Sequence, residues 1–582
     1  TLWRLGVSRR GLLEWTAAGD LVRRDQGLAA IYRSMWIAPV LALIAGAGLA
    51  LRVPMALPVA APILLAWLAA PLLAWWMSRP LKPREAHLNA EQTEFLHRSA
   101  RKTWGFFETF VGADDHWLPP DNLQEHPVAV VAHRTSPTNM GLSLLANLAA
   151  YDFGYLPAGA LMARTSAALR TMTGLERHRG HFFNWYDTQS LQPLEPRYIS
   201  SVDSGNLAGH LSTLQPGLLA LIDAPILNPR WLEGIADTWQ VLTEALTATT
   251  SRLTLASMTG RRPALSAPLA RFDQQLKAAR LAPPTDLNEA CGCLGVLSAE
   301  AEAAARDLDA GASDEVAAWT RRLAQQCWAL RDDLLFLAPW LHLHVEAATA
   351  TATASESTRL PDFCGPVQLG AQSTNSKNDP NSLETQTANV LSVVDKSRQS
   401  DLALTLRQLA ALEQTGLDRP VLARIREIEQ LAITAGSLSR LDYNFLFDEA
   451  QSLLAIGYRV AERRCDESYY DLLASEARLG CFVAIAQGQL PQESWFALGR
   501  LLTRAVGNTT LLSWSGSMFE YLMPLLVMPS YDNTLLDQTY RTAVARQIAY
   551  GKERGVPWGV SESGYNGVDA QLNYQYRAFG VP

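Results

Sequence analysis

The chain has 582 residues, 48% of them hydrophobic, and a formal net charge of −7. This length can hold a membrane segment together with one large domain, or two medium-sized ones. The acidic balance argues against a nucleic-acid partner, because phosphate binding requires a basic surface. No phosphate loop, dinucleotide fingerprint or zinc-type cysteine spacing occurs, so the sequence predicts neither a cofactor nor a metal.

Two apolar stretches near the N-terminus predict a transmembrane hairpin over residues 35–78. Residues 35–51 and 53–77 contain no charged side chain, and only Arg52 separates them. Each stretch is long enough to cross a bilayer, which takes roughly 17–25 residues. Tryptophans near the ends are typical of interfacial anchors. A buried hairpin of a globular protein is the alternative.

Basic residues flank this hairpin on both sides, whereas its turn holds only Arg52. They are Arg4, Arg9, Arg10, Arg23, Arg24 and Arg33 before the hairpin and Arg79, Lys82 and Arg84 after it. The positive-inside rule therefore predicts that the juxtamembrane segment 1–34 and the domain 85–582 both face the cytoplasm. The pattern does not predict a signal peptide, because the apolar region is too long, doubled and internal.

Helical periodicity recurs from Leu88 onward and predicts an all-α domain. We expect helices over residues 90–111, 140–150, 158–174, 207–222, 231–249, 297–309, 314–337, 400–413, 420–436 and 468–487. Strand signals are short, as in 127–132. A toroid of paired helices, with the intervening turns forming a cleft at one end, would account for this pattern. Residues of about 225–400 carry few motifs and are expected to form a helical elaboration.

A glutamate in the predicted helix 468–487 is the first candidate for chemistry. In such a helix Leu472, Glu476 and Leu479 share one face, which places a carboxylate on an apolar stripe. A desolvated glutamate has a raised pKa, as a general acid for glycosidic cleavage requires. The alternative is a buried Glu476 that pairs with Arg478 or another arginine.

Two later blocks also carry glutamates. Glu520 lies among apolar residues in L-S-W-S-G-S-M-F-E-Y, close to Trp514, and Glu562 lies between two serines in the loop that follows Trp558. Hydroxyl and backbone N–H groups around Glu562 could hold it ionised. An ionised carboxylate opposite a protonated one is the arrangement that glycoside cleavage requires. In each block the glutamate could equally be a loop residue with satisfied hydrogen bonds.

Three earlier blocks combine aromatic rings with arginine, asparagine and aspartate, which are common hydrogen-bonding partners of sugar hydroxyls. The candidate binding residues in these blocks are Arg134, Asn139, Trp185, Tyr186, Asp203 and Asn206. A helix-capping role for Asp203 is equally open. The repetition of one composition at several helix ends predicts the lining of the cleft.

Six blocks together resemble cyclic β-1,2-glucan synthases. H-R-T-S-P-T-N-M-G, F-N-W-Y-D, S-V-D-S-G-N-L-A, Y-Y-D-L-L-A-S-E-A-R, W-S-G-S-M-F-E-Y-L-M-P and W-G-V-S-E-S-G-Y-N occur in that family's order. The resemblance identifies the chain as the middle, transglycosylating segment with its preceding hairpin. It implies an (α/α)6 barrel similar to glycoside hydrolase family 189. It further implies a bacterial inner-membrane polypeptide in which a glycosyltransferase segment precedes this one and a phosphorylase segment follows.

The activity that this resemblance implies is cyclisation of linear β-1,2-glucan by anomer-retaining intramolecular transglycosylation. Carried over motif by motif, the acid/base is Glu476 and the nucleophile is Glu562, with Glu520 as the residue that could displace either. The residues implied to hold the acceptor glucose and exclude water are Trp514, Tyr521, Trp558 and Tyr565. A β-1,2-glucan endo-hydrolase and a non-catalytic, glucan-holding scaffold remain the alternatives.

Overall fold

The computed structural model describes most of the chain as two compact units, Thr1–His87 and Leu88–Pro582. The described residues are 28–77, 87–125, 128–256, 266–308, 314–341, 401–411, 418–561, 563–568, 574–577 and 580–581. Segment 1–27 and residues 342–400 of the expected elaboration therefore lie outside the described residues, as does Glu562.

The first unit is a pair of apolar helices. It contains α2 (Leu28–Ser34), α3 (Ile37–Arg52), η2 (Pro54–Ala56) and α4 (Leu57–Met77), and α3 packs against α4. Most of their apolar side chains are exposed. Among the described residues, Pro54–Met77 is the helix whose length and composition allow it to cross a membrane. α3 is apolar but has 16 residues, about 24 Å at 1.5 Å per residue, which is shorter than a typical span.

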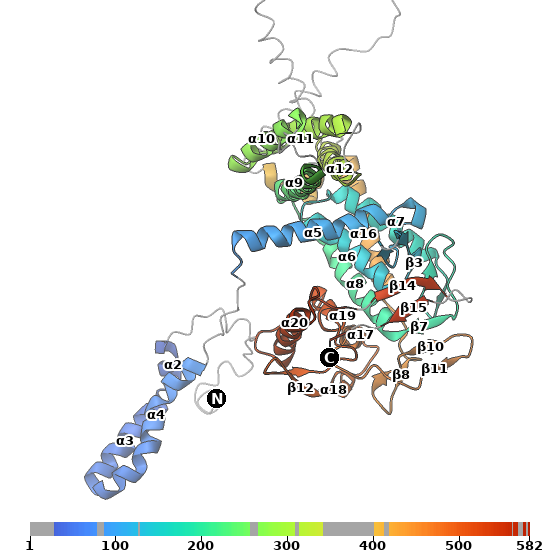
Figure 1. The fold of residues 1–582 in the computed structure, drawn as a ribbon. Helices are drawn as coiled ribbons and strands as arrows, with labels where there is room; N and C mark the ends of the chain where they lie inside the picture. The colour runs from blue at the N-terminus through green and yellow to red at the C-terminus, as the bar shows by residue number, and fades with distance from the viewer. Residues whose placement is uncertain are drawn as a thin grey trace, which may run out of the picture. The chain divides into compact units, whose positions relative to one another are not determined.

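The second unit is predominantly helical (Figure 1). Its longer helices are α5 (Ala90–Phe110), α6 (Pro137–Asp152), α7 (Ala158–Gly174), α8 (Ser201–Ala220), α9 (Trp231–Ala256), α10 (Ala267–Leu281), α11 (Leu287–Leu308), α12 (Asp314–Leu337), α16 (Asp418–Leu438), α17 (Ala477–Ala486) and α20 (Leu535–Arg554). Short helical turns are η3 (Ala113–Asp115), η4 (Asp401–Ala403), α15 (Leu406–Ala411), α18 (Glu493–Ala497), α19 (Met518–Leu522) and η5 (Met523–Leu526).

Strands in this unit are short, antiparallel and confined to the connections. They pair as β1 (Leu123–Gln124) with β2 (Val130–Val131), β3 (Arg134–Thr135) with β6 (Tyr186–Asp187), β4 (Arg177–His178) with β5 (His181–Phe182), β8 (Phe447–Asp448) with β9 (Leu453–Leu454), β12 (Leu502–Ala505) with β13 (Asn508–Leu511) and β14 (Ser563–Val568) with β15 (Tyr574–Arg577). β10 (Gly457–Arg459) lies between β7 (Tyr198–Ser200) and β11 (Arg464–Cys465). The predicted all-α class is therefore confirmed.

Helix α8 is the centre of the packing and contacts α6, α16 and α17, while α7 contacts α6 and α16 (Figure 1). The inner helices α6, α8 and α17 bury most of their side chains. At the crossing of α8 and α17, a Cβ added at Gly205 would lie 2.4 Å from the Cα of Gly480. Two glycines thus allow the two backbones to touch. Inner helices backed by outer ones form the expected toroid of paired helices.

The predicted helix over 468–487 is wrong in its first half. Tyr469 bridges to Ala455 and Leu472 bridges to Gly499, so this stretch runs beside other segments of the chain and α17 begins only at Ala477. Pairing with distant segments thus overrides the local helical pattern. Leu472 consequently does not share a helix face with Glu476. The sequence analysis missed α20, and it gave no bounds for α10 within the expected helical elaboration.

Candidate active site

Glu476 is the N-cap residue of α17, so it lies at the end of a helix rather than on an apolar stripe. Its side chain is partly buried, and its Oε2 accepts a hydrogen bond of 2.6 Å from the Nδ2 of Asn206 on α8. Asn206 itself is fully buried. The close crossing of α8 and α17 at Gly205 and Gly480 brings this amide to the glutamate. Two residues that the sequence placed in separate blocks therefore meet.

A second carboxyl group, that of Asp203, lies along the same hydrogen-bond network. The Nδ2 of Asn206 also donates to Thr138 Oγ1 at 3.1 Å, and the Thr138 hydroxyl donates to Asp203 Oδ1 at 2.6 Å. Burial raises the pKa of Asp203, and hydrogen bonds from neighbouring hydroxyls offset only part of that rise. Ser200, not Asp203, is the N-cap of α8, which leaves the Asp203 carboxylate to the network.

Trp185 joins this network through Asn184. With its amide oriented to satisfy both neighbours, Asn184 donates to Asp203 Oδ2 at 3.1 Å and accepts from Trp185 Nε1 at 3.1 Å. Tyr186, in contrast, is fully buried. Its hydroxyl donates to the carbonyl of Glu176 at 2.6 Å and accepts from the Phe183 N–H at 2.9 Å. Both bonds tie the hydroxyl to the interior and give Tyr186 a supporting role in the structure. Its contact with substrate stays a prediction.

A neighbouring polar cluster surrounds Asp121, which the sequence analysis missed. Asn139, in the first turn of α6, donates to Asp121 Oδ1 at 3.0 Å, and Arg134 Nη2 lies 3.5 Å from Asp121 Oδ2. The Arg134 guanidinium also lies 5.8 Å from the centre of the Trp185 ring. Burial lowers the pKa of Arg134 to about 9 and raises the pKa of Asp121. An amide, a guanidinium, a carboxylate and an indole together suit sugar hydroxyls and a pyranose face.

Glu520 organises a tight turn. Its Oε2 accepts hydrogen bonds from the hydroxyls of Ser513 and Ser515 at 2.9 and 2.8 Å and from the N–H groups of Ser515, Gly516 and Ser517 at 2.9, 3.1 and 3.4 Å. The residue is only 4% exposed. It also forms the capping box of α19 with Ser517. This geometry makes Glu520 the support of its turn.

The turn that Glu520 supports presents Trp514. This ring is 52% exposed and meets Tyr470 edge-to-face, with ring centres 6.3 Å apart. The neighbouring Tyr521 is buried and donates its hydroxyl to the Leu511 carbonyl at 2.9 Å. An indole can therefore reach a ligand here, whereas Tyr521 is committed to holding the loop.

Arg478 connects the Glu476 turn with the Glu520 turn. Its guanidinium is 1% exposed and donates to the carbonyls of Ser475, Glu520 and Tyr521 at 2.8, 3.2 and 2.7 Å. It also lies 5.3 Å from the centre of the Tyr540 ring on α20. Burial lowers its pKa, although its interactions with Tyr540 and Glu476 raise it in part. One buried cation thus fixes three chain segments.

The block before Glu562 is attached to the same turn. The N–H of Met518 donates to the Val560 carbonyl at 3.0 Å, and the N–H of Phe519 donates to the Ser561 hydroxyl at 3.2 Å. Gln547 of α20 accepts from the Val560 N–H at 2.7 Å and donates to the Gly516 carbonyl at 3.0 Å. The residue preceding Glu562 is therefore held against α19.

Two other predicted residues, Trp558 and Tyr565, lie on either side of Glu562 in this block. Trp558 is 54% exposed. Tyr565 lies in β14 opposite Gln575, and its side chain is outside the described part of the chain.

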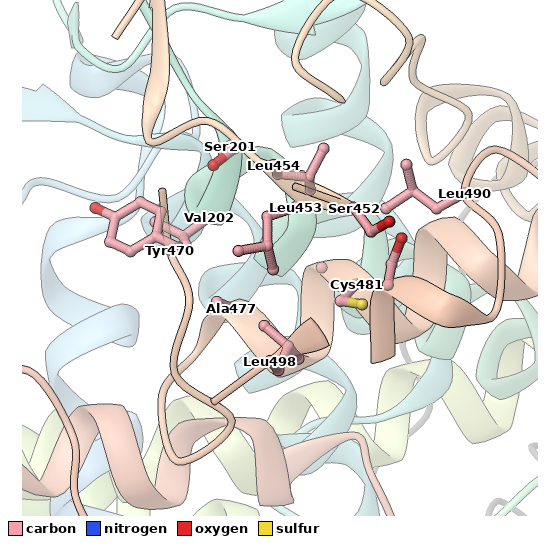
Figure 2. Close-up of a pocket in the computed structure, with 12 residues that line it drawn as sticks. Ser201, Val202, Ser452, Leu453, Leu454, Tyr470, Ala477, Cys481, Leu490 and Leu498 are labelled. Atoms are coloured by element: carbon pink, nitrogen blue, oxygen red, sulfur yellow. The ribbon is translucent and has the colours of Figure 1, made fainter. Parts of the chain in front are cut away.

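A small cavity lies beside α17, where Val202, Leu453, Ala477 and Cys481 converge (Figure 2). Its free volume is about 20 Å³, room for about one water molecule. It is mainly apolar and too small for a glucose unit. A larger cavity, of about 700 Å³, lies between α5 and α9 beside His97 and Asp237 and contains none of the predicted site residues. The polar clusters around Glu476 and Asp121, where the predicted residues meet, are the candidate active site.

One curated relative agrees with the sequence motifs. No family model matches the chain. The chain is 35% identical, over 595 aligned positions, to the cyclic β-(1,2)-glucan synthase NdvB of Rhizobium meliloti (strain 1021). This alignment covers all of the chain and 18% of the relative, so the chain spans less than a fifth of that protein's length. The resemblance predicted from the six blocks is confirmed.

A solved structure described as a glucoamylase, from Bacteroides fragilis NCTC 9343, matches 86% of this chain and 75% of its own. Its TM-score is 0.36, with 11% identity.

Proposed function

We propose that this chain cyclises linear β-1,2-glucan by anomer-retaining intramolecular transglycosylation, as one segment of a cyclic β-1,2-glucan synthase. The observation that carries the proposal is the meeting of four sequence blocks. Asn206 holds Glu476 at the end of α17. Arg478 ties that end to the Glu520 turn, and the Glu520 turn holds Ser561, the neighbour of Glu562. The similarity along the whole chain supports the same assignment.

The reaction proceeds in two steps that share one acid/base. First, Glu562 attacks the anomeric carbon while Glu476 gives its proton to the departing glycosidic oxygen, which leaves a glycosyl-enzyme and a shortened chain. Next, the 2-hydroxyl at the non-reducing end of the bound glucan attacks that carbon and returns its proton to Glu476. Glu562 departs as a carboxylate, and the glucan is closed into a ring.

A polar cluster and two exposed aromatic rings hold the glucan. The Arg134–Asp121–Asn139 cluster presents donors and acceptors to sugar hydroxyls, and the exposed rings of Trp514 and Trp558 cover pyranose faces. Shielding of the glycosyl-enzyme from water favours cyclisation over hydrolysis.

The hairpin of α3 and α4 anchors the domain in the lipid bilayer of a bacterial inner membrane, with both flanks on the cytoplasmic side. Linear glucan then reaches the site from the glycosyltransferase segment of the same polypeptide, which also carries the phosphorylase segment.

Mass spectrometry of products from linear β-1,2-glucan tests this proposal, with the whole 582-residue chain held in detergent. Products one water lighter than linear oligomers are rings and are the expected result. Shorter linear chains alone would identify a hydrolase, and an unchanged substrate would identify a scaffold. Glu476→Gln should abolish the rings, whereas Glu493→Gln, a change at an exposed residue of α18, should not.

A further inference from the structure

A chain of hydrogen bonds connects Glu476 to Asp203 through two buried, uncharged side chains. The Thr138 hydroxyl donates to Asp203 Oδ1 at 2.6 Å, and the Asn206 amide donates to Thr138 Oγ1 at 3.1 Å and to Glu476 Oε2 at 2.6 Å. Thr138 is 6% exposed and Asn206 is not exposed at all. Because no solvent reaches the middle of this chain, its protein partners alone determine the direction of each bond.

The direction of the chain is set at its Asp203 end. A threonine hydroxyl has one hydrogen, and the Thr138 hydroxyl donates it in the hydrogen bond to the Asp203 carboxylate. Thr138 can then offer only a lone pair to Asn206, so the amide must present N–H rather than C=O. The same amide edge faces Glu476, and an oxygen there would meet two acceptors.

The rest of the Asn206 side chain does not determine this orientation. Its Oδ1 is buried and, within the described residues, has no hydrogen-bond partner. A buried carbonyl oxygen without a hydrogen bond is unfavourable. The surroundings of Oδ1 therefore do not favour the orientation that the Asn206 amide adopts. An ionised Glu476 accepts from the amide and so favours the same orientation. When Glu476 is protonated, the preference must come from Thr138 and, through it, from Asp203.

We propose that Asp203 is a positioning residue that acts through Thr138 to keep the Asn206 N–H directed at Glu476. This inference rests on the proposed function. With that N–H at Oε2, the proton of a protonated Glu476 resides on Oε1, from which it can be transferred to the glycosidic oxygen. If the amide turned over, its oxygen would accept that proton in a hydrogen bond and withhold it from the substrate.

The test compares Thr138→Val, Thr138→Ser, Asp203→Asn and the double variant Thr138→Val/Asp203→Asn in the whole chain. Initial rates of product formation from linear β-1,2-glucan give kcat and KM for each. Valine keeps the shape of threonine but removes the hydroxyl, and asparagine can donate to Thr138 and thereby reverse the chain. Thr138→Val and Asp203→Asn should each lower kcat about tenfold, the usual effect of losing one charge-assisted hydrogen bond. KM should stay within about twofold of wild type.

Two further readouts separate positioning from a merely structural role. Thr138→Ser keeps the hydroxyl and should retain wild-type kcat. The double variant should be no slower than either single variant, because both substitutions interrupt the same series of hydrogen bonds. A turned amide stabilises the protonated Glu476, which raises its pKa, so the alkaline limb of kcat/KM should move to higher pH in Thr138→Val. The other ionisable groups near this site, Arg478 on α17, Glu520 on α19 and Tyr540 on α20, are the same in every variant, so the comparison of pH profiles is not affected by changes in them.

Several outcomes would overturn the inference. Multiplied effects in the double variant, or an unchanged kcat in Thr138→Val with wild-type melting behaviour, would show that no such chain operates. A rise in KM alone for Asp203→Asn would show that Asp203 binds a sugar hydroxyl directly. A wild-type chain that forms rings while the variants behave in these ways refutes only the positioning role. A wild-type chain that leaves the glucan unchanged refutes the proposed function as well.

Discussion

Two glutamates in this molecule look alike in sequence and differ in surroundings. Glu476 is partly buried at the end of α17, with an inner-helix asparagine on one oxygen. Glu520 is 4% exposed, and one of its oxygens accepts five hydrogen bonds from a single turn. These five hydrogen bonds make the Glu520 carboxylate necessary for the conformation of the turn. The comparison separates a partly exposed carboxyl group, which we propose exchanges protons with the glucan, from one that holds its turn together.

The largest predicted effect belongs to Glu476→Gln. The amide keeps the size of the side chain but cannot supply a proton, so the rate of ring formation should fall on the order of 10³-fold. The unfolding free energy should change by less than about 1 kcal/mol, because the position is partly exposed. Product analysis together with denaturant unfolding measures both quantities. A loss of stability that matches the loss of activity would remove the distinction from Glu520.

Gly205→Ala should have the next largest effect. The new Cβ would lie 2.4 Å from the Cα of Gly480, and neither backbone can yield without separating α8 from α17. We expect the unfolding free energy to fall by about 3 kcal/mol, with activity reduced because Asn206 moves away from Glu476. Gly292→Ala on α11 is the matched control, since its new Cβ would meet nothing within 4 Å. It should stabilise the helix by up to about 1 kcal/mol. Equal losses in the two variants would contradict the role of this crossing.

Glu520→Gln should lower stability, which Glu476→Gln should leave nearly unchanged. A neutral amide is a weaker acceptor for the donors of the turn, and its NH2 group would face some of them. We expect a loss of about 2 kcal/mol in unfolding free energy, with activity falling because the turn no longer holds Trp514 and Ser561. Urea unfolding measures the first effect and product formation the second. A fully stable but inactive Glu520→Gln would instead indicate that Glu520 takes part in the chemistry.

The sequence predicted what local signals determine. The limits of α7 and α12 follow from periodicity alone, and α5 begins where Asn89 and Gln92 form a capping box. The S-x-x-E spacing of Ser517 and Glu520 is the same signal, and it could have identified Glu520 as structural.

Tertiary contacts account for what the sequence could not predict. Asp121 acquires its setting from Asn139 and Arg134, residues outside its own segment, and no local pattern marks it. The early start predicted for α17 failed because Leu472 bridges to Gly499. The motif therefore pointed to Glu476 as a candidate, but it did not predict that this residue lies at the end of a helix.

The smallest effect is expected for Trp514→Ala. The ring is 52% exposed and contacts Tyr470 edge-on, so its removal should leave the fold intact and cost about 1 kcal/mol of stacking on a sugar face. KM for linear β-1,2-glucan should rise roughly fivefold while kcat stays within about twofold of wild type. Phe496→Ala removes a more exposed ring, on α18, and should change neither constant. A fall in kcat for Trp514→Ala would mean that the Glu520 turn shapes the transition state as well as the bound glucan.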